Sequence, residues 1–271
     1  MNEKVILITG ASSGLGETCA NYLSSKGYCV YGTFRTQPFH QSSDSSVHMV
    51  QMNVDDASSV HNAINHVIKK EGRIDVVVNL AGWGISGPIE TVTIDETKKL
   101  FETNFYGTLR VLQTILPEMR KQGRGRIINV SSIGGVLGLP FQGTYSATKF
   151  AVEGMTEALR MEVKSFGVDV VLVEPGDFKT NFTKNRKKHH IENDSVYHSQ
   201  QIKTESVVEH DETHGYEPIK FARLIEKIIN KNNPRLRYRV GSFSQKFAAA
   251  LKGVAPDRFV QWMLMKYYKL L

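Results

Sequence analysis

Short runs of valine, isoleucine and leucine alternate along the chain with longer stretches in which apolar residues recur every three or four positions. Runs that are apolar at nearly every position are typical of strands buried on both faces, as in a parallel sheet. We expect strands at residues 4–9, 28–34, 47–54, 74–82, 125–132, 168–176 and 235–240. We expect helices at residues 14–26, 57–70, 94–122 (as two helices), 144–166 and 218–231.

Repeated strand–helix–strand units are joined by right-handed crossovers, which place helices on both faces of the sheet. The order of elements therefore predicts an α/β fold, namely a Rossmann-type doubly wound parallel β-sheet with three layers, α/β/α. The chain has no internal repeat and no linker, so we expect a single domain over residues 1–271.

Residues 183–216 interrupt this pattern. The segment is polar, has little periodicity, and holds five of the nine histidines of the chain. Because long irregular segments in compact domains are usually functional or disordered, we expect a mobile lid or substrate segment over a site. A metal site is the alternative, but the histidines lack a recognised ligand spacing, so we expect no metal.

The net charge of +7 is concentrated at one end of the chain, because residues 217–271 hold 12 Lys or Arg and 3 Asp or Glu. Within this region, residues 243–271 form a basic amphipathic C-terminal segment. Such a segment packs on the domain with its cations reaching the solvent, or it contacts a membrane surface or a partner. No nucleic-acid motif accompanies the charge, so we expect no nucleic-acid partner.

Composition narrows the class of protein further. A hydrophobic content of 41% and a charged content of 23% are ordinary for a soluble globular chain. We find no signal-peptide pattern and no apolar run long enough to span a bilayer. Two cysteines are too few for a disulfide framework, and we therefore expect a cytoplasmic protein.

The segment TGASSGLG (9–16) follows the first expected strand and opens the first helix. Gly10 permits a tight turn, Gly14 allows the backbone close to a diphosphate, and Gly16 lets the helix pack closely on the sheet. The helix N-terminus then offers free N–H groups to the anion. This arrangement predicts a dinucleotide-binding loop.

The end of the second strand commonly decides between the two nicotinamide dinucleotides. An acidic residue there binds the ribose of NAD, whereas an arginine accommodates the 2′-phosphate of NADP. The stretch VYGTFRT (30–36) has no carboxylate, and Arg35 stands just past the strand. We therefore expect a preference for NADP(H), with Ser12 donating a further hydrogen bond.

Six motifs occur in a fixed order along residues 4–180: TGASSGLG (9–16), NLAG (79–82), NFYG (104–107), NVSS (129–132), YSATK (145–149) and EPG (174–176). In this order they resemble the compact, single-domain type of the short-chain dehydrogenase/reductase family. The hydroxysteroid and retinoid dehydrogenase branch is the most similar. The resemblance implies an oxidoreductase that is a homo-dimer or homo-tetramer.

The same resemblance implies a catalytic tetrad of Asn104, Ser132, Tyr145 and Lys149. Ser132 is chosen over Ser131 because its 13-residue spacing to Tyr145 matches the family pattern. The residues that the resemblance places around the cofactor are Gly10, Ser12, Ser13, Gly14, Leu15, Gly16, Arg35, Asn53, Val54, Asn79, Ala81, Gly82, Tyr145, Lys149, Pro175, Gly176 and Thr180.

Two positions depart from the family pattern. Leu80 stands where the family usually has a second asparagine, and we expect it to loosen the bracing between strands. Asn53 stands where the family has an aspartate, and its carbonyl oxygen can still accept from an adenine amine.

Tyr145 and Lys149 are four residues apart, so both side chains leave one face of a helix. A solvated surface pair has this spacing too, but the ordered motifs favour a general acid/base tyrosine whose pKa is lowered by the lysine together with the oxidised nicotinamide. The small residues between them are expected to leave room for cofactor and substrate. Ser132 would polarise the substrate carbonyl, and Asn104, in a locally distorted helix, would anchor a water that relays protons to Lys149.

The expected substrate pocket is apolar and aromatic, with walls from Trp83, Ile133, Phe141, Gln142 and Phe178. It lacks a charged clamp for a sugar phosphate, so we expect a hydrophobic ketone or secondary alcohol that is steroid-like, retinoid-like or a long-chain 3-keto lipid. One alternative is a non-catalytic NADP(H)-sensing protein on the same fold. Another is a sugar-nucleotide epimerase or dehydratase, for which the C-terminal region is short.

Overall fold

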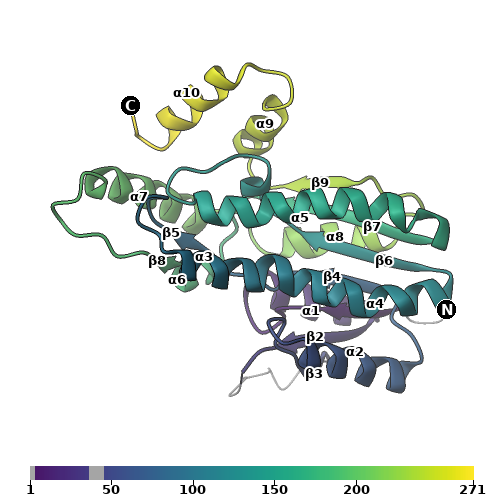
Figure 1. Ribbon diagram of the computed structural model, residues 1–271. Helices are drawn as coiled ribbons and strands as arrows, with labels where there is room; N and C mark the ends of the chain where they lie inside the picture. The colour runs from purple at the N-terminus through teal and green to yellow at the C-terminus, as the bar shows by residue number, and fades with distance from the viewer. Residues whose placement is uncertain (1–3, 37–45) are drawn as a thin grey trace.

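The computed structural model describes residues 4–36 and 46–271 and is built around one twisted parallel sheet (Figure 1). The sheet has seven strands in the order β3-β2-β1-β4-β6-β7-β9. Its strands are β1 (Val5–Ile8), β2 (Cys29–Phe34), β3 (His48–Gln51), β4 (Val76–Asn79), β6 (Gly125–Val130), β7 (Val168–Pro175) and β9 (Arg237–Val240). Every neighbouring pair in it is parallel, which confirms the predicted fold class.

Helices cover both faces of this sheet and complete three layers (Figure 1). One apolar cluster lies under α2 (Ala57–Glu71), α4 (Thr108–Gln122) and α5 (Gly143–Glu162). A second cluster lies under α1 (Gly14–Ser25) and α8 (Ile219–Ile229). Successive strand residues enter opposite clusters, as Leu7 and Ile8 do, because side chains alternate across a strand. This explains why the strands are apolar at almost every position.

The interrupted segment is more ordered than the sequence predicts. It contains α6 (Phe182–Asn185), β8 (Lys187–Lys188) and the 16-residue helix α7 (His198–Thr213). The prediction of an irregular segment is wrong because α7 buries polar side chains, among them Gln201, Thr204 and Glu212, so no apolar stripe marks the helix. Strand β8 pairs with β5 (Ile85–Ser86) and ties the segment to the loop after β4.

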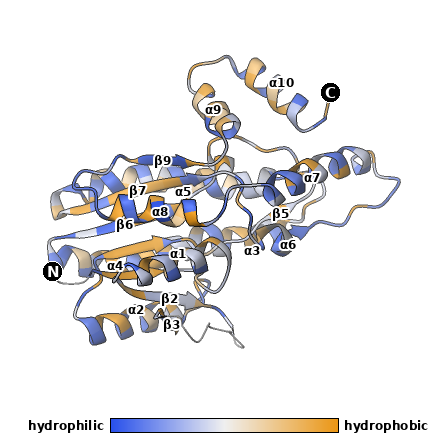
Figure 2. Ribbon diagram, turned by 180° about the vertical axis from the view of Figure 1, so that it is seen from behind, coloured by the Kyte–Doolittle hydropathy of each residue, from blue (hydrophilic) through white to orange (hydrophobic). Residues whose placement is uncertain are grey.

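The C-terminal segment forms two helices, α9 (Phe243–Leu251) and α10 (Asp257–Tyr267). They project from the three-layer body at the end where α7 lies, in both views of the molecule (Figures 1 and 2). Their inner sides are packed, because Ala249 and Val260 are buried against Ile133 and Leu137. In the part of the chain that the structure describes, no helix combines the length and apolar character needed to cross a bilayer.

The helix expected over 94–122 divides into α3 (Ile94–Phe101), a π-helical turn (Glu102–Gly107) and α4. Thr93 caps α3 through a capping box with Glu96. Short 3-10 turns at Ile133–Gly135 and Lys164–Phe166 flank α5. The π-helical turn places Asn104 at the distortion that the sequence predicts for it.

Candidate active site

One cavity of about 1030 Å³ runs along the carboxyl ends of the parallel strands. It begins where β1 and β4 lie side by side and their crossovers leave in opposite directions, which is where ligands bind in open α/β sheets. At one end the cavity is lined by the glycine-rich loop, and at the other by residues of α5, α7, α9 and α10. A ligand that occupies one end can therefore reach a second ligand at the other.

The glycine-rich loop has the geometry that the sequence predicts. Gly10 has a φ of +70°, and a Cβ there would lie 2.9 Å from the Cα of Ala81. Gly16 packs even more closely, since a Cβ would lie 2.2 Å from the carbonyl oxygen of Gly10. Gly16 does not line the cavity, whereas Gly10, Ser12, Ser13, Gly14 and Leu15 do. Ser13 makes no side-chain cap, which leaves the first N–H groups of α1 free for an anion.

The residues at this end fit a bound dinucleotide. Arg35 is exposed and lines the cavity, and within the described residues no carboxylate pairs with it. Asn53 also lines the cavity, but its Oδ1 already accepts from the backbone N–H of Asp55 at 3.2 Å. Asp55 was not among the predicted residues, yet it lines the cavity with a buried Oδ1 that has no partner. The Asn53 oxygen has a second lone pair and can still accept from an adenine amine.

Asn79 is placed differently from the expectation. Its side chain is buried and does not line the cavity, because Nδ2 donates to Asn129 Oδ1 at 2.8 Å. Asn129 in turn donates to Thr156 on α5 at 2.9 Å. Thr9 accepts from the backbone N–H groups of Leu80 and Ala81. Asn79 therefore braces strands β4 and β6 next to the position where Leu80 was expected to loosen them.

The remaining cofactor residues predicted from the resemblance line the cavity. Val54 stands with Asn53 at the adenosine end, and Ala81 and Gly82 follow β4. Pro175, Gly176 and Thr180 stand after β7, and the side chain of Thr180 approaches Gly14 across the cavity.

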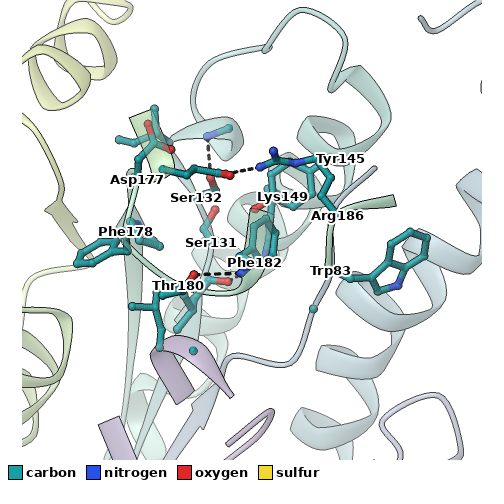
Figure 3. Close-up of a pocket in the computed structure, with 18 of the residues that line it drawn as sticks. Trp83, Ser131, Ser132, Tyr145, Lys149, Asp177, Phe178, Thr180, Phe182 and Arg186 are labelled. Atoms are coloured by element: carbon teal, nitrogen blue, oxygen red, sulfur yellow. Dashed lines mark hydrogen bonds and ion pairs between the residues drawn. The ribbon is translucent and has the colours of Figure 1, made fainter. Parts of the chain in front are cut away.

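Tyr145 and Lys149 both lie on the buried face of α5 and line the cavity together with Ser132 (Figure 3). They are 8% and 7% exposed, which excludes a solvated surface pair. Ser132 Oγ accepts from the N–H of Gly134 at 3.0 Å, a contact that does not use its hydroxyl proton. Lys149 Nζ donates to the carbonyl oxygen of Val130 at 3.1 Å.

Burial dominates the titration of this pair. It raises the pKa of Tyr145 to about 12, and a hydrogen bond with Ser132 opposes this effect. Burial also lowers the pKa of Lys149 to about 8, opposed by Glu153. In the protein itself, desolvation of the phenol outweighs the neighbouring charges. The expected lowering of the Tyr145 pKa, which includes the charge of an oxidised nicotinamide, stays a prediction.

The small residues between Tyr145 and Lys149 serve a different purpose from the expected one. Ser146 and Thr148 are buried, and Ser146 Oγ accepts from the N–H of Leu139 at 3.2 Å. Thr148 accepts from Asn104 Nδ2 at 3.1 Å and donates to the carbonyl oxygen of Tyr145. They anchor α5 to its surroundings and leave only Ala147 exposed between the two functional side chains.

Asn104 does not line the cavity but lies directly behind it. Its Oδ1 accepts from the N–H of Trp83 and its Nδ2 donates to the Trp83 carbonyl oxygen, each at 3.0 Å. A Cβ on Gly82 would lie 3.0 Å from Asn104 Oδ1 and 3.8 Å from Lys149 Nζ. Asn104 therefore fixes the loop after β4 against α5, beside the lysine.

Of the predicted substrate residues, Trp83, Ile133, Gln142 and Phe178 line the cavity. Phe141 does not, because its φ of +56° directs the ring toward Tyr197, with 6.4 Å between ring centres. Phe182 also lines the cavity, and its ring centre lies 6.2 Å from that of Tyr145. Phe182 enters from the interrupted segment, and so this segment does lie over the site.

The far end of the cavity is polar, which the sequence did not predict. It includes Asp177, Arg186, Asp211, Glu212 and Tyr267. Arg186 forms a buried ion pair with Glu212 (Figure 3). The guanidinium carbon of Arg186 lies 5.6 Å from the centre of the Phe182 ring. These residues come from the end of β7, the interrupted segment, α7 and α10, so no single stretch of sequence brings them together. Among the described residues, no group of three His, Cys, Asp or Glu side chains is arranged to hold a metal ion.

The sequence matches the family described as short chain dehydrogenase over residues 4–191. The chain belongs to this family. Among its relatives, the 3-ketodihydrosphingosine reductase of Bacteroides thetaiotaomicron is 42% identical over 269 residues, which are 99% of either chain. The 17-beta-hydroxysteroid dehydrogenase type 1 of Homo sapiens is 38% identical over 195 residues, 67% of this chain and 59% of the relative. The chain is thus an oxidoreductase of the dehydrogenase/reductase kind, acting between CH–OH and C=O groups.

Solved structures show the same fold. A short-chain dehydrogenase from Streptomyces avermitilis superposes with a TM-score of 0.81 at 30% identity, covering 100% of this chain and 97% of the other. ElxO, solved with NADP bound, superposes with a TM-score of 0.72 at 30% identity and covers 88% and 96%.

Proposed function

We propose that this protein reduces the ketone of a long-chain lipid with NADPH. The observation that carries the proposal is the position of Tyr145, which stands with Ser132 in a cavity continuous with the glycine-rich loop. A nicotinamide extended from that loop along Pro175, Gly176 and Thr180 would end next to the tyrosine. When bound, NADPH supplies the hydride that reduces the carbonyl carbon.

Side chains of the protein would hydrogen-bond and protonate the oxygen of that carbonyl. The Ser132 hydroxyl donates to it and stabilises the charge that develops on reduction. Tyr145 gives its proton to the same oxygen, which completes the alcohol. The tyrosine then recovers a proton from solvent by way of Lys149. A tyrosine with a pKa near 12 is protonated at neutral pH, as a proton donor must be.

Arg35 supports the preference for NADPH. Its guanidinium, exposed at the end of β2, is free to pair with a 2′-phosphate, and the cavity has no acidic residue at the end of β2 that would bind a ribose diol instead. Ser12 and Ser13 line the same region and add hydroxyl donors. A titration with each reduced nucleotide tests this part of the proposal.

The apolar middle of the cavity supports a hydrophobic substrate. Ile133, Leu137, Leu139, Phe178 and Phe182 line it, and α9 and α10 add Phe247, Ala248, Met263 and Leu264. A volume of about 1030 Å³ for cofactor and substrate together suits a long flexible chain that leaves by the α9–α10 side. Among the substrates expected from the sequence, we select the long-chain 3-keto lipid, in line with the reductase from Bacteroides thetaiotaomicron.

The same side of the molecule supports contact with an anionic membrane. Phe243, Phe259 and Trp262 are 77%, 48% and 49% exposed on α9 and α10, whose ribbons in Figure 2 include hydrophobic stretches. Five cations are interleaved with these residues, namely Lys246, Lys252, Arg258, Lys266 and Lys269. Asp257 is the single acidic residue in this part of the sequence. An apolar and basic pair of helices is suited to the lipid interface. A lipid substrate would then enter the cavity past Phe247.

We also propose that the protein is a cytoplasmic homo-dimer or homo-tetramer. Tyr106, Phe150, Met161 and Phe166 are exposed on the π-helical turn, α5 and the turn after it, and such apolar surface supports association. Among the described residues neither Cys19 nor Cys29 forms a disulfide, as suits a reducing compartment. Light scattering on the purified protein measures the assembly.

Turnover tests the proposed function. The protein is incubated with NADPH and 3-ketodihydrosphingosine, and the loss of nucleotide absorbance is compared with the alcohol formed, measured by mass spectrometry. Equal amounts of oxidised nucleotide and alcohol support the proposal. Bound NADPH with no consumption in the presence of this ketone and of steroid and retinoid carbonyls would favour a nucleotide-sensing protein.

A further inference from the structure

The polar end of the cavity holds more negative than positive charge. Asp177, Asp211 and Glu212 line it, together with the single arginine Arg186 and with Lys187 at the margin. The cations are already paired, because Arg186 forms an ion pair with Glu212, and Lys187 with Glu96 at 2.9 Å. Asp211 accepts a hydrogen bond from the Tyr267 hydroxyl. Asp177 is then the carboxylate whose charge remains to be explained.

Asp177 has only neutral partners. Its Oδ2 accepts from Gln245 Nε2, and its backbone N–H donates to Gln245 Oε1 at 3.2 Å. Across residues 4–36 and 46–271, its Oδ1 has no hydrogen-bond partner and no Lys, Arg or His forms an ion pair with the carboxylate. Buried carboxylates are normally paired with a cation, because desolvating an isolated charge is costly.

The environment of Asp177 makes its ionisation unfavourable in the free protein. Its pKa is raised to about 7, chiefly by burial and then by the carboxylates of Glu212 and Asp211, while Gln245 and the charge of Arg186 act in the opposite direction. A cation placed beside Asp177 would relieve this repulsion. Since the carboxylate faces a cavity, a ligand can bring that cation.

We propose that Asp177 binds a protonated amine that the substrate carries close to its carbonyl group. This inference rests on the proposed function, since it assigns a second point of recognition to the substrate of Tyr145. The Asp177 Oδ1 accepts from the ammonium, and Gln245 holds the carboxylate in place. The ligand class is a long-chain amino ketone, not a simple ketone.

The two points of recognition line the same cavity. Asp177 follows Pro175 and Gly176, which we expect at the nicotinamide end of this cavity. Figure 3 shows Asp177, Ser132 and Arg186 around the same opening. An ammonium at Asp177 therefore lies near the carbonyl that Tyr145 protonates, and the alkyl chain extends toward α9 and α10.

Arg186 adds a donor to the same corner. Its side chain is 5% exposed, and its Nη2 pairs with Glu212. Because Arg186 lines the cavity, its guanidinium would donate to a substrate hydroxyl there. A donor and an acceptor side by side suit an amino alcohol head group, which carries both an ammonium and a hydroxyl.

The test compares two substrates and two variants. The substrates are 3-ketodihydrosphingosine, whose amine stands on the carbon next to the carbonyl, and the same molecule with hydrogen in place of the amine. The variants are Asp177→Asn, which keeps an oxygen for Gln245 but has no charge, and Glu209→Gln. Glu209 is an exposed α7 carboxylate paired with Lys188, outside the cavity, and serves as the matched control. The assay is run near pH 8, above the Asp177 pKa of about 7.

We expect the wild type to favour the amino ketone in kcat/KM, and Asp177→Asn to lose about tenfold or more on it, mostly through KM. The same variant should stay within about twofold on the ketone without the amine, and Glu209→Gln should match the wild type on both. Equal wild-type kcat/KM for the two ketones would overturn the inference while the reductase stands, and this comparison needs no variant to fold. An equal loss on both in Asp177→Asn would show a structural role. Reduction of neither ketone by a protein that binds NADPH would instead refute the proposed function.

Discussion

The Nζ atom of Lys149 lies 5.9 Å from the centre of the Tyr145 ring and donates its hydrogen bond to the carbonyl oxygen of Val130. The lysine is thus held beside the tyrosine by the end of β6. Because both groups are buried, the phenol keeps its proton and the ammonium loses its proton more easily than in water. This pairing sets the pH range in which the site can reduce a ketone.

Reduction should slow as the pH rises through about 8. Burial lowers the pKa of Lys149 from its ordinary value to about 8, so the ammonium is present below that pH and is lost above it. Tyr145, with a pKa near 12, stays protonated throughout. As the pH rises, the positive charge of Lys149 that supports the developing oxyanion is therefore lost before the Tyr145 proton. A pH profile of kcat with saturating substrate measures this, and a profile that stays flat well above pH 8 would contradict it.

Arg35→Ala should weaken NADPH binding by about tenfold and leave NADH binding nearly unchanged. The estimate is at the low end for a charge-assisted pair, because Arg35 is exposed to solvent. Fluorescence titration of the bound nucleotide gives both dissociation constants. Arg235→Ala, an exposed arginine outside the cavity, is the control. Equal losses of affinity for the two nucleotides in Arg35→Ala would show that Arg35 does not bind the 2′-phosphate.

Gly16→Ala should disrupt the dinucleotide loop. Its Cβ would lie 2.2 Å from the carbonyl oxygen of Gly10, and neither backbone can move without displacing the loop. Overpacking of this kind costs about 1–3 kcal/mol in unfolding free energy. Urea unfolding measures the loss, and nucleotide titration should show weakened binding.

Gly154→Ala provides the matched control for this substitution. Gly154 lies within α5, is exposed, and has no atom within 4 Å of a built Cβ. Because alanine is the better helix former, the variant should gain about 0.5–1 kcal/mol. If Gly16→Ala were as stable as Gly154→Ala, the close packing of α1 on the loop would be refuted.

The exposed apolar residues of α9 and α10 should bring the protein to anionic vesicles. Sedimentation with phosphatidylserine vesicles should retain the wild type, and the Phe259→Ser, Trp262→Ser double variant should remain mostly in the supernatant. Val196→Ser removes an apolar residue that is 87% exposed elsewhere and should not change retention. Equal retention on neutral vesicles, or none on anionic ones, would argue against the basic face as a lipid contact.

Much of the fold was predictable because each part of it carries a local signal. The strands are continuous apolar runs, and the glycine-rich loop and the Tyr145–Lys149 pair are short motifs. The position of Asn104 in a distorted helix was also predictable, and this distortion is the π-helical turn Glu102–Gly107. These features depend on residues that are close together in the sequence.

The polar corner of the cavity was not predictable for the opposite reason. Helix α7 buries Glu212 only because Arg186, 26 residues earlier, neutralises it, so the helix shows no apolar stripe. Gln245 on α9 meets Asp177 at the end of β7, 68 residues away. Likewise, Asn79 has the appearance of a cofactor ligand, and only its pairing with Asn129 across two strands shows it to be a brace.

The proposed ketone reduction depends most on Tyr145, and the Tyr145→Phe variant tests this function directly. Phenylalanine preserves the ring against Phe182 and removes only the proton donor. We expect reduction of 3-ketodihydrosphingosine by NADPH to fall by at least about a hundredfold, in line with the loss of a general acid. NADPH affinity, measured by fluorescence titration on the same samples, should stay within a few-fold. Turnover close to that of the wild type in Tyr145→Phe would contradict the proposed role of this cavity.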